Sequence, residues 1–173
     1  GERFSISNLM HPISKSYGEV SKKSFFENPP RSVLLTSHLK RHRFKLYRHC
    51  KFSMGCDLYG RKFKPINQTK KQLLTKYEFN LCPENSVGEG YITEKIPEAF
   101  ISGCIPITYC NPEDLIFDFN PKAVINLYGL TRREARKKLK EIANNYDLYT
   151  DLRNQPLVIK KPTIDPLIKL LSS

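Results

Sequence analysis

Apolar and polar positions alternate along this chain in a way that predicts repeated units of a strand followed by a helix. Residues 32–37 are a short apolar run with β-branched side chains, which is typical of a buried strand. Residues 38–50 then place apolar side chains at helical spacing. Further strands are predicted over residues 52–58, 77–81, 105–109 and 124–127, and further helices over 69–77, 94–101 and from 131 onward. Asn111-Pro112 predicts a turn after the strand over 105–109. About five such units predict an α/β, Rossmann-like fold: an open, mainly parallel sheet with helices on both faces.

Two helices have boundaries that the sequence defines closely. Pro97 is tolerated only in a first helical turn, so that helix begins near Thr93 or Glu94 and ends at Gly103. Residues 131–134 match a capping box and begin a later helix. In open parallel sheets, ligands bind at the carboxyl ends of the strands, and the polar loops of this chain fall at that edge.

Composition and charge narrow the possible partners. Apolar residues make up 39% of the 173 residues, enough for a packed domain, and no apolar run reaches the length of a membrane span. A formal net charge of +12 favours anionic partners: nucleic acid, anionic lipid or phosphorylated small molecules. Basic residues gather at 40–51 and at 132–140, and we interpret the second cluster as a solvated helix face.

The five cysteines are odd in number and form no CxxC pair, which argues against a disulfide scaffold or a zinc knuckle. We expect small buried or half-buried thiols in a reducing compartment. Residues 1–30 are polar and end in two prolines, so we interpret them as a linker or strap from a missing N-terminal domain.

The segment of residues 77–95 holds the candidate chemistry, because a strand ends, polar residues follow and a helix begins. Backbone N–H groups at a helix start favour a phosphate, and Lys95 adds a full charge. Glu94 can accept hydrogen bonds from sugar hydroxyls, and Tyr91 can lie against a base or a sugar. A nicotinamide site is disfavoured, because the glycine fingerprint lacks its third glycine and no acid ends the next strand.

Four blocks of the chain resemble the α1,3/α1,4-fucosyltransferase family. Its signature is similar to Glu84-Asn85-Ser86, a short loop and Tyr91-Ile92-Thr93-Glu94-Lys95. The other three blocks are Arg43-Phe44-Lys45-Leu46-Tyr47, Asp57-Leu58-Tyr59-Gly60-Arg61 and Phe119-Asn120-Pro121-Lys122-Ala123-Val124-Ile125-Asn126. All four blocks occur along the chain in the order typical of the family. The resemblance spans about residues 31–130.

The resemblance implies a GT-B-type inverting enzyme whose C-terminal domain binds GDP-fucose, here residues 31–173. Arg43 and Lys95 would hold the diphosphate, and Glu94 would be catalytic, easing positive charge at the anomeric carbon. The other donor-binding residues implied are Glu84, Asn85, Ser86, Tyr91 and Thr93. A separate N-terminal domain would bind the acceptor, a glycan containing N-acetylglucosamine, and supply the base.

No metal or other cofactor is expected, because two fixed cations can stabilise the charge that develops on GDP and the chain has no D-x-D motif. No residue here is a persuasive candidate for the base. We expect a location in the cytoplasm or at the cytoplasmic face of a bacterial membrane, with peripheral membrane contact; the Golgi lumen is the alternative.

Two other functions stay open. The charge would suit a basic binding module for nucleic acid or anionic lipid, although no nucleic-acid motif is present and no nucleic-acid partner is expected. The same fold could also serve a transferase for a different sugar nucleotide. Polymer binding would fall steeply with salt and ignore the base, whereas pocket binding would select the base.

Overall fold

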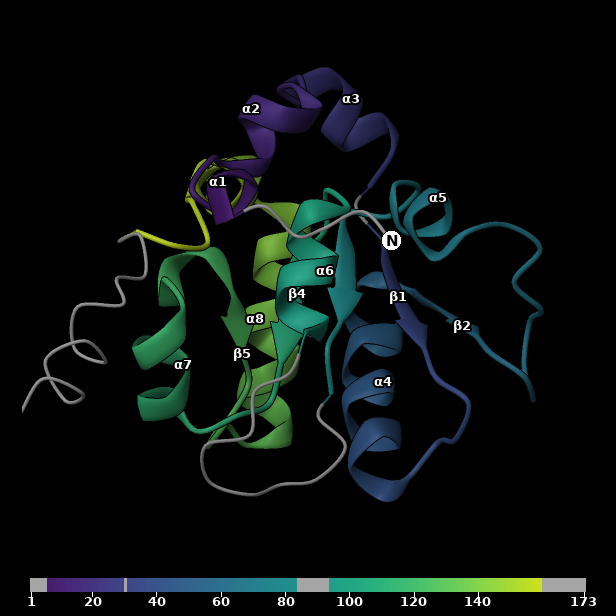
Figure 1. Cartoon of the computed structure of the whole chain (residues 1–173). Coiled ribbons are helices and arrows are strands. Elements are labelled where there is room, and N and C mark those ends of the chain that lie inside the picture. Colours follow the sequence, from purple (N-terminus) through teal and green to yellow (C-terminus); the bar gives the residue numbers. More distant parts are fainter. Residues whose placement is uncertain (1–5, 30, 84–93, 160–173) are drawn as a thin grey trace, which may run out of the picture.

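Five short strands form one sheet in which every neighbouring pair is parallel (Figure 1). The computed structural model describes residues 6–29, 31–83 and 94–159. The strands are β1 (Ser32–Leu35), β2 (Cys56–Tyr59), β3 (Phe79–Leu81), β4 (Ile105–Thr108) and β5 (Ile125–Asn126), in the order β2-β1-β3-β4-β5. The chain leaves β1 toward β2 on one side and continues through β3, β4 and β5 on the other. The direction therefore reverses between β1 and β3, which is where such sheets bind ligands.

Helices on both faces of the sheet explain why its central strands β3 and β4 are buried throughout. Every residue of β3 and β4 is buried, whereas β2, at the sheet edge, is half-buried along its length. On one face, α4 (Arg41–Met54) and α8 (Arg132–Asn144) pack against each other through their buried apolar sides. On the other face, α6 (Lys95–Ile101) lies against β4, and Figure 1 shows it in front of the sheet with α8 behind. These features confirm the predicted fold class.

Shorter helices complete the described chain. They are α1 (Ile6–Leu9), α2 (Ile13–Tyr17), α3 (Lys22–Glu27), α5 (Lys70–Leu74), α7 (Pro112–Asp118), the 3-10 turn η1 (Pro121–Ala123) and α9 (Tyr146–Arg153). Figure 1 places α1, α2 and α3 together at the end of the sheet remote from α4. Leu9, Ile13 and Phe25 from these helices join the main core. Where we expected a linker or strap, residues 6–27 thus form helices packed on this domain; their relation to a further domain stays a prediction.

Three element boundaries differ from the sequence-based ones. Residues 52–54 are helical, because α4 continues to Met54 and ends at Gly55, whose φ of +75° suits a glycine. The turn predicted at Asn111-Pro112 instead begins α7, with Asn111 as N-cap and Pro112 in the first turn. The helix predicted over residues 69–77 is shorter, since α5 ends at Leu74.

The cysteines lie as expected. Cys50, Cys82 and Cys104 are buried and Cys56 and Cys110 are half-buried, all as free thiols. Burial raises the pKa of Cys56 to about 12, so this thiol stays protonated at neutral pH. Among the helices that the structure describes, the longest has 14 residues, too few to cross a bilayer.

Candidate functional site

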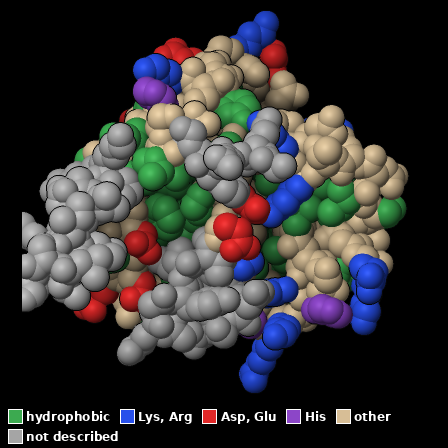
Figure 2. Space-filling view, in the orientation of Figure 1, with side chains coloured by type: hydrophobic (Ala, Val, Ile, Leu, Met, Phe, Trp, Pro, Cys, Tyr) green, Lys and Arg blue, Asp and Glu red, His purple; other side chains and the backbone are tan. Residues whose placement is uncertain are grey.

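A cavity of about 360 Å³ lies at the reversal point of the sheet, at the carboxyl ends of β1, β2 and β3. Its size suits a small ligand. Arg43, Glu94 and Lys95 all line it, although they come from two different helices. Figure 2 shows blue basic and red acidic side chains side by side near the middle of the face that it draws. The structure therefore brings together the three predicted site residues that it describes.

Arg43 is held in place by the end of β1. Its Nη1 donates to the Thr36 hydroxyl at 2.7 Å and to the His38 carbonyl at 3.2 Å. The Thr36 hydroxyl in turn donates to the His38 carbonyl at 2.9 Å. Thr36 is only 8% exposed, so its hydroxyl is largely shielded from water. The guanidinium thus has a fixed position before any ligand binds, which reduces the entropy lost on binding.

The end of β2 approaches Thr36 so closely that only glycine fits there. A Cβ on Gly60 would lie 1.9 Å from the Thr36 carbonyl oxygen, and the φ of Gly60 is +148°. Both features exclude an ordinary side chain. Gly60 belongs to the block matched by resemblance, and the structure gives its physical reason: it lets β2 close one wall of the cavity beside the support of Arg43.

Glu94 and Lys95 reach the cavity from the start of α6. Glu94 is the N-cap residue and is exposed, while Lys95 is the first helical residue and is half-buried. The predicted helix start is confirmed. The remaining predicted site residues lie outside the described residues: Glu84, Asn85, Ser86, Tyr91 and Thr93.

Two further polar residues line the cavity and were missed by sequence reasoning. Asn80, on β3, is 4% exposed, and its Oδ1 has no hydrogen-bond partner in the described structure, which leaves a buried acceptor available to a ligand. Lys70, on α5, forms an ion pair with Glu98 of α6. Asn80 was the detectable signal, since it is the one amide in the strand predicted over residues 77–81 and lies between Phe79 and Leu81. Lys70 could not be found in this way, because its place at the cavity depends on a contact between α5 and α6 that the sequence pattern does not reveal.

A second cavity of about 410 Å³ adjoins the first, and Pro83 lines both. Its walls come from α4, α8 and the ends of β4 and β5, and they include the apolar Leu46, Leu127 and Leu130. His49 also lines it, is 7% exposed and has no hydrogen-bond partner for Nδ1 in the described structure. Burial, and then the nearby positive charges, lower the pKa of His49, so its imidazole is neutral at pH 7. This cavity suits a flat, mostly apolar group with one polar edge.

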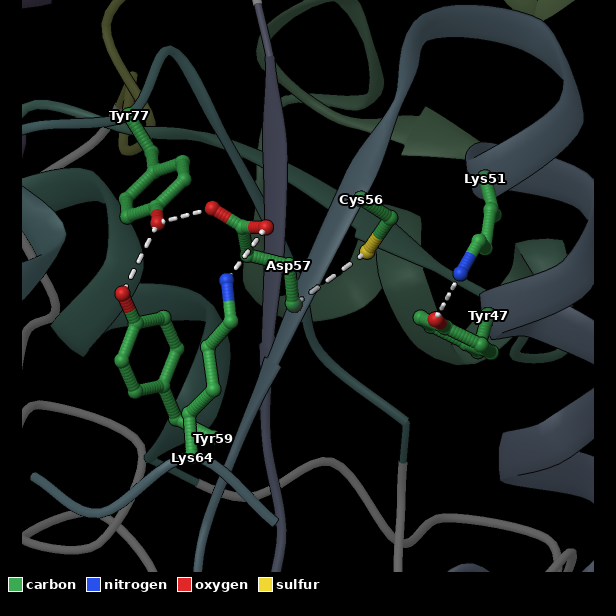
Figure 3. A network of polar contacts seen from close by, with 7 residues as sticks. All are labelled: Tyr47, Lys51, Cys56, Asp57, Tyr59, Lys64 and Tyr77. Carbon is green, nitrogen blue, oxygen red and sulfur yellow. Dashed lines mark hydrogen bonds and ion pairs between the residues drawn. The ribbon is translucent and has the colours of Figure 1, made fainter.

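A polar network beside the first cavity fixes the edge strand β2 (Figure 3). The Asp57 carboxylate accepts hydrogen bonds from the Tyr77 hydroxyl at 2.5 Å and from Lys64 Nζ at 3.2 Å. Tyr77 also lies 3.3 Å from the Tyr59 hydroxyl. These bonds, the one from Tyr77 first, lower the pKa of Asp57. The network ties β2 to the residues around it and has a structural role next to the cavity.

Within residues 6–29, 31–83 and 94–159, no three His, Cys, Asp or Glu side chains lie close enough together to hold a metal ion. The charged groups described at the first cavity are Arg43, Lys70, Glu94 and Lys95.

A family model named glycosyltransferase family 10 (fucosyltransferase), C-terminal, matches residues 31–154. The chain belongs to this family. The match covers the whole sheet, both cavities and the two helices that hold Arg43 and Lys95. The family resemblance read from the sequence is therefore confirmed.

Individual fucosyltransferases are also similar to this chain over parts of their length. An alpha-(1,3)-fucosyltransferase of Helicobacter pylori is 38% identical over 86 residues, 49% of this chain and 18% of that protein. A 4-galactosyl-N-acetylglucosaminide 3-alpha-L-fucosyltransferase of Pongo pygmaeus is 42% identical over 55 residues, 31% of this chain and 15% of that protein. A crystal structure of an alpha1,3-fucosyltransferase with GDP-fucose superposes with a TM-score of 0.69 at 23% identity, covering 84% of this chain and 47% of the other. The chain thus spans less than half the length of each of these relatives.

Proposed function

We propose that this domain binds GDP-fucose and serves as the donor half of an inverting α1,3-type fucosyltransferase. The observation that supports this most directly is the meeting of Arg43 and Lys95 at one cavity at the reversal point of the sheet. Two cations from separate helices suit a diphosphate, because Arg can bind two phosphate oxygens at once and Lys acts as a point charge. The crystal structure of a relative with GDP-fucose supports the choice of ligand.

In the proposed reaction, the bond between the fucose anomeric carbon and the β-phosphate oxygen breaks, and its electron pair stays on GDP. Arg43 and Lys95 stabilise the negative charge that develops there. Glu94 lies at the same cavity and stabilises the positive charge that develops on the sugar ring. We assign donor-binding roles in the adjoining segment to Glu84, Asn85, Ser86, Tyr91 and Thr93. These charged residues stabilise the transition state without a metal or other cofactor.

The second cavity is the natural place for the guanine ring. Its walls are mainly apolar, it adjoins the cavity of Arg43 through Pro83, and the neutral His49 offers one buried nitrogen. A flat base with polar atoms on its edge matches such a site. The buried Oδ1 of Asn80 would accept a hydrogen bond from a hydroxyl of the sugar nucleotide in the first cavity, which would satisfy this oxygen.

The acceptor hydroxyl attacks the anomeric carbon and gives its proton to a base from a further domain, since we assign that role to no residue of this chain. The Pongo pygmaeus relative, a 4-galactosyl-N-acetylglucosaminide 3-alpha-L-fucosyltransferase, supports a glycan acceptor containing N-acetylglucosamine. The bacterial relative supports a location in the cytoplasm or at the cytoplasmic face of a bacterial membrane. The Golgi lumen is the alternative, and the isolated chain should transfer fucose poorly.

The test is calorimetric titration of the chain with GDP-fucose, GDP, UDP and ADP. Guanine-selective binding is expected, and Lys95→Ala or Arg43→Ala should weaken it by about 1.5–3 kcal/mol, the size of a hydrogen bond to a charged group. Lys122→Ala, on the η1 turn outside both cavities, is the matched control and should bind as the wild type does.

Three outcomes would contradict parts of this proposal. Equal binding by the wild type and both variants would remove the roles of Arg43 and Lys95. Tighter binding of UDP or ADP would point to a transferase for another sugar nucleotide. Binding that ignores the base and falls steeply with salt would favour the polymer-binding alternative.

A further inference from the structure

The positive charge of this chain is concentrated on two adjacent helices. α4 and α8 together contain eleven Lys and Arg residues, five and six respectively, against Glu134 and Glu141. Their net charge is thus +9, out of a formal +12 for all 173 residues. The two helices pack directly against each other on one face of the sheet. Arg43 lines the first cavity and Arg41 and Lys45 line the second, which leaves eight cations of the helix pair outside both cavities.

The outer side of this helix pair is defined here as the α4–α8 face. It comprises Arg48, Phe52, Arg133, Arg136, Lys137 and Lys140. The two helices are joined there by Phe52, whose ring lies 4.6 Å from the Arg136 guanidinium and 5.9 Å from that of Arg48. A shallow hollow on α8 is lined by five of its basic side chains and a single acid, Glu141.

Within the part of the chain that the structure describes, no cation of this face forms an ion pair with an acid. The ion pairs of the described residues are Lys23–Glu27, Lys64–Asp57 and Lys70–Glu98, all of them elsewhere. Burial, and then the neighbouring charges of Arg132 and Arg48, lower the pKa of Arg136. Such crowding destabilises the free protein and favours an anionic partner. Sequence reasoning treated residues 132–140 as an ordinary solvated face because it could not place α4 beside them.

Apolar rings are exposed on and beside the same face. Phe52 is 58% exposed, and Phe44, eight residues earlier on α4, is 43% exposed with Arg48 5.7 Å from its ring. A surface that alternates phenylalanines with Arg and Lys matches the interface of a bilayer, where rings enter the headgroup region and cations contact phosphates.

We propose that the α4–α8 face binds the surface of a bilayer that contains anionic phospholipid. Nucleic acid is the less suitable polyanion, because stacking on a base needs a free ring face and the Arg136 guanidinium lies over the ring of Phe52. The proposal does not depend on donor binding, since none of the six residues lines the cavity of Arg43.

The test is co-flotation of the chain with phosphatidylcholine vesicles made with or without phosphatidylglycerol. The wild type should float with the anionic vesicles. With the neutral vesicles it should not bind and should remain at the bottom of the gradient. A triple variant, Arg133→Ala with Lys137→Ala and Lys140→Ala, should partition about 100-fold less, since each cation near the surface contributes several-fold. Its side chains are exposed, so the fold should persist, and circular dichroism checks this.

A matched control removes three exposed cations from the remote helices α2 and α3: Lys15→Ala, Lys22→Ala and Lys23→Ala. It should float as the wild type does. Phe52→Ser, a second variant that retains every charge, should weaken flotation and leave its salt dependence unchanged. Failure of the wild type to bind anionic vesicles, or equal losses in the two triple variants, would overturn the proposal. So would displacement of the bound vesicles by single-stranded DNA.

Discussion

At the scale of the residue, the candidate site depends on groups that position others. Arg43 was identified from the sequence by family resemblance, but Thr36, which orients it, was not, because Thr36 lies at a strand end with no pattern of its own. Asn80 and His49 were also missed, since a sequence does not show which polar side chains are buried without a partner. Glu94 and Lys95 were placed by helix-start rules, and their convergence with Arg43 needed the fold.

Thr36→Val removes the hydroxyl between Arg43 and the His38 carbonyl. The loss of one hydrogen bond to a charged group should weaken GDP-fucose binding by about 1.5 kcal/mol. Thr36→Ser retains the hydroxyl and should bind within about twofold of the wild type. Calorimetric titration measures both, and an unchanged dissociation constant for the valine variant would show that Arg43 needs no such support.

Asp57 makes stability depend on pH in a defined direction. Its hydrogen bonds from Tyr77 and Lys64 lower its pKa below the unfolded value of 3.8. The stabilisation is therefore fully present above about pH 4 and is lost as the pH falls through the lower folded pKa. Asp57→Asn should be less stable than the wild type at neutral pH, and the difference should shrink below about pH 4.

Urea unfolding at a series of pH values measures this difference. Asp151→Asn, at an exposed position on α9, is the control for removing a carboxylate. A gap between the wild type and Asp57→Asn that stays constant down to the most acid sample would refute the assigned role of the Tyr77 and Lys64 bonds.

At the scale of the element, local capping and proline signals predicted the starts of α6 and α8 better than other helix ends or strand lengths. The capping box at Thr131 and Glu134 is present and begins α8 as expected. α7 was missed because its Asn-Pro start is equally typical of a turn, and only packing of Leu115 into the core decides between them. The strands are two to four residues long, so their ends depend on pairing with neighbours that the sequence does not reveal.

Gly60→Ala should disturb two elements at once, β2 and the end of β1. The new Cβ would meet the Thr36 carbonyl at 1.9 Å, so the backbone must move. We expect a loss of more than about 2 kcal/mol in unfolding free energy and weaker GDP-fucose binding. Gly129→Ala also has a positive φ, +74°, but has open space, and should lose only about 1 kcal/mol. Equal losses in urea unfolding would contradict the steric argument.

At the scale of the whole molecule, topology explains why distant residues form one site. The reversal between β1 and β3 places the ends of three strands around one cavity, and the strand–helix alternation in the sequence predicted this edge. What alternation could not predict is the packing of residues 6–27, because three short helices with one buried side chain each resemble a polar linker.

Ligand binding should stabilise the whole domain. GDP at a hundred times its dissociation constant should raise the unfolding free energy by about 2.7 kcal/mol, because it binds only the folded state. UDP at the same concentration should raise it much less if the base is selected. Thermal unfolding with each nucleotide measures this, and equal shifts would contradict guanine selection.

α4 is a single unbroken helix of 14 residues that holds Arg43 in its first turn and Phe52 near its last. At a rise of 1.5 Å per residue, those two positions are about 14 Å apart along a stiff rod. A surface that binds one end of α4 therefore fixes both the height and the tilt of the other end of this helix. If the outer face rests on a bilayer, the reach from that bilayer to the fucose is fixed by the length of one helix, and acceptors of the wrong length would be rejected without any contact to their sugars.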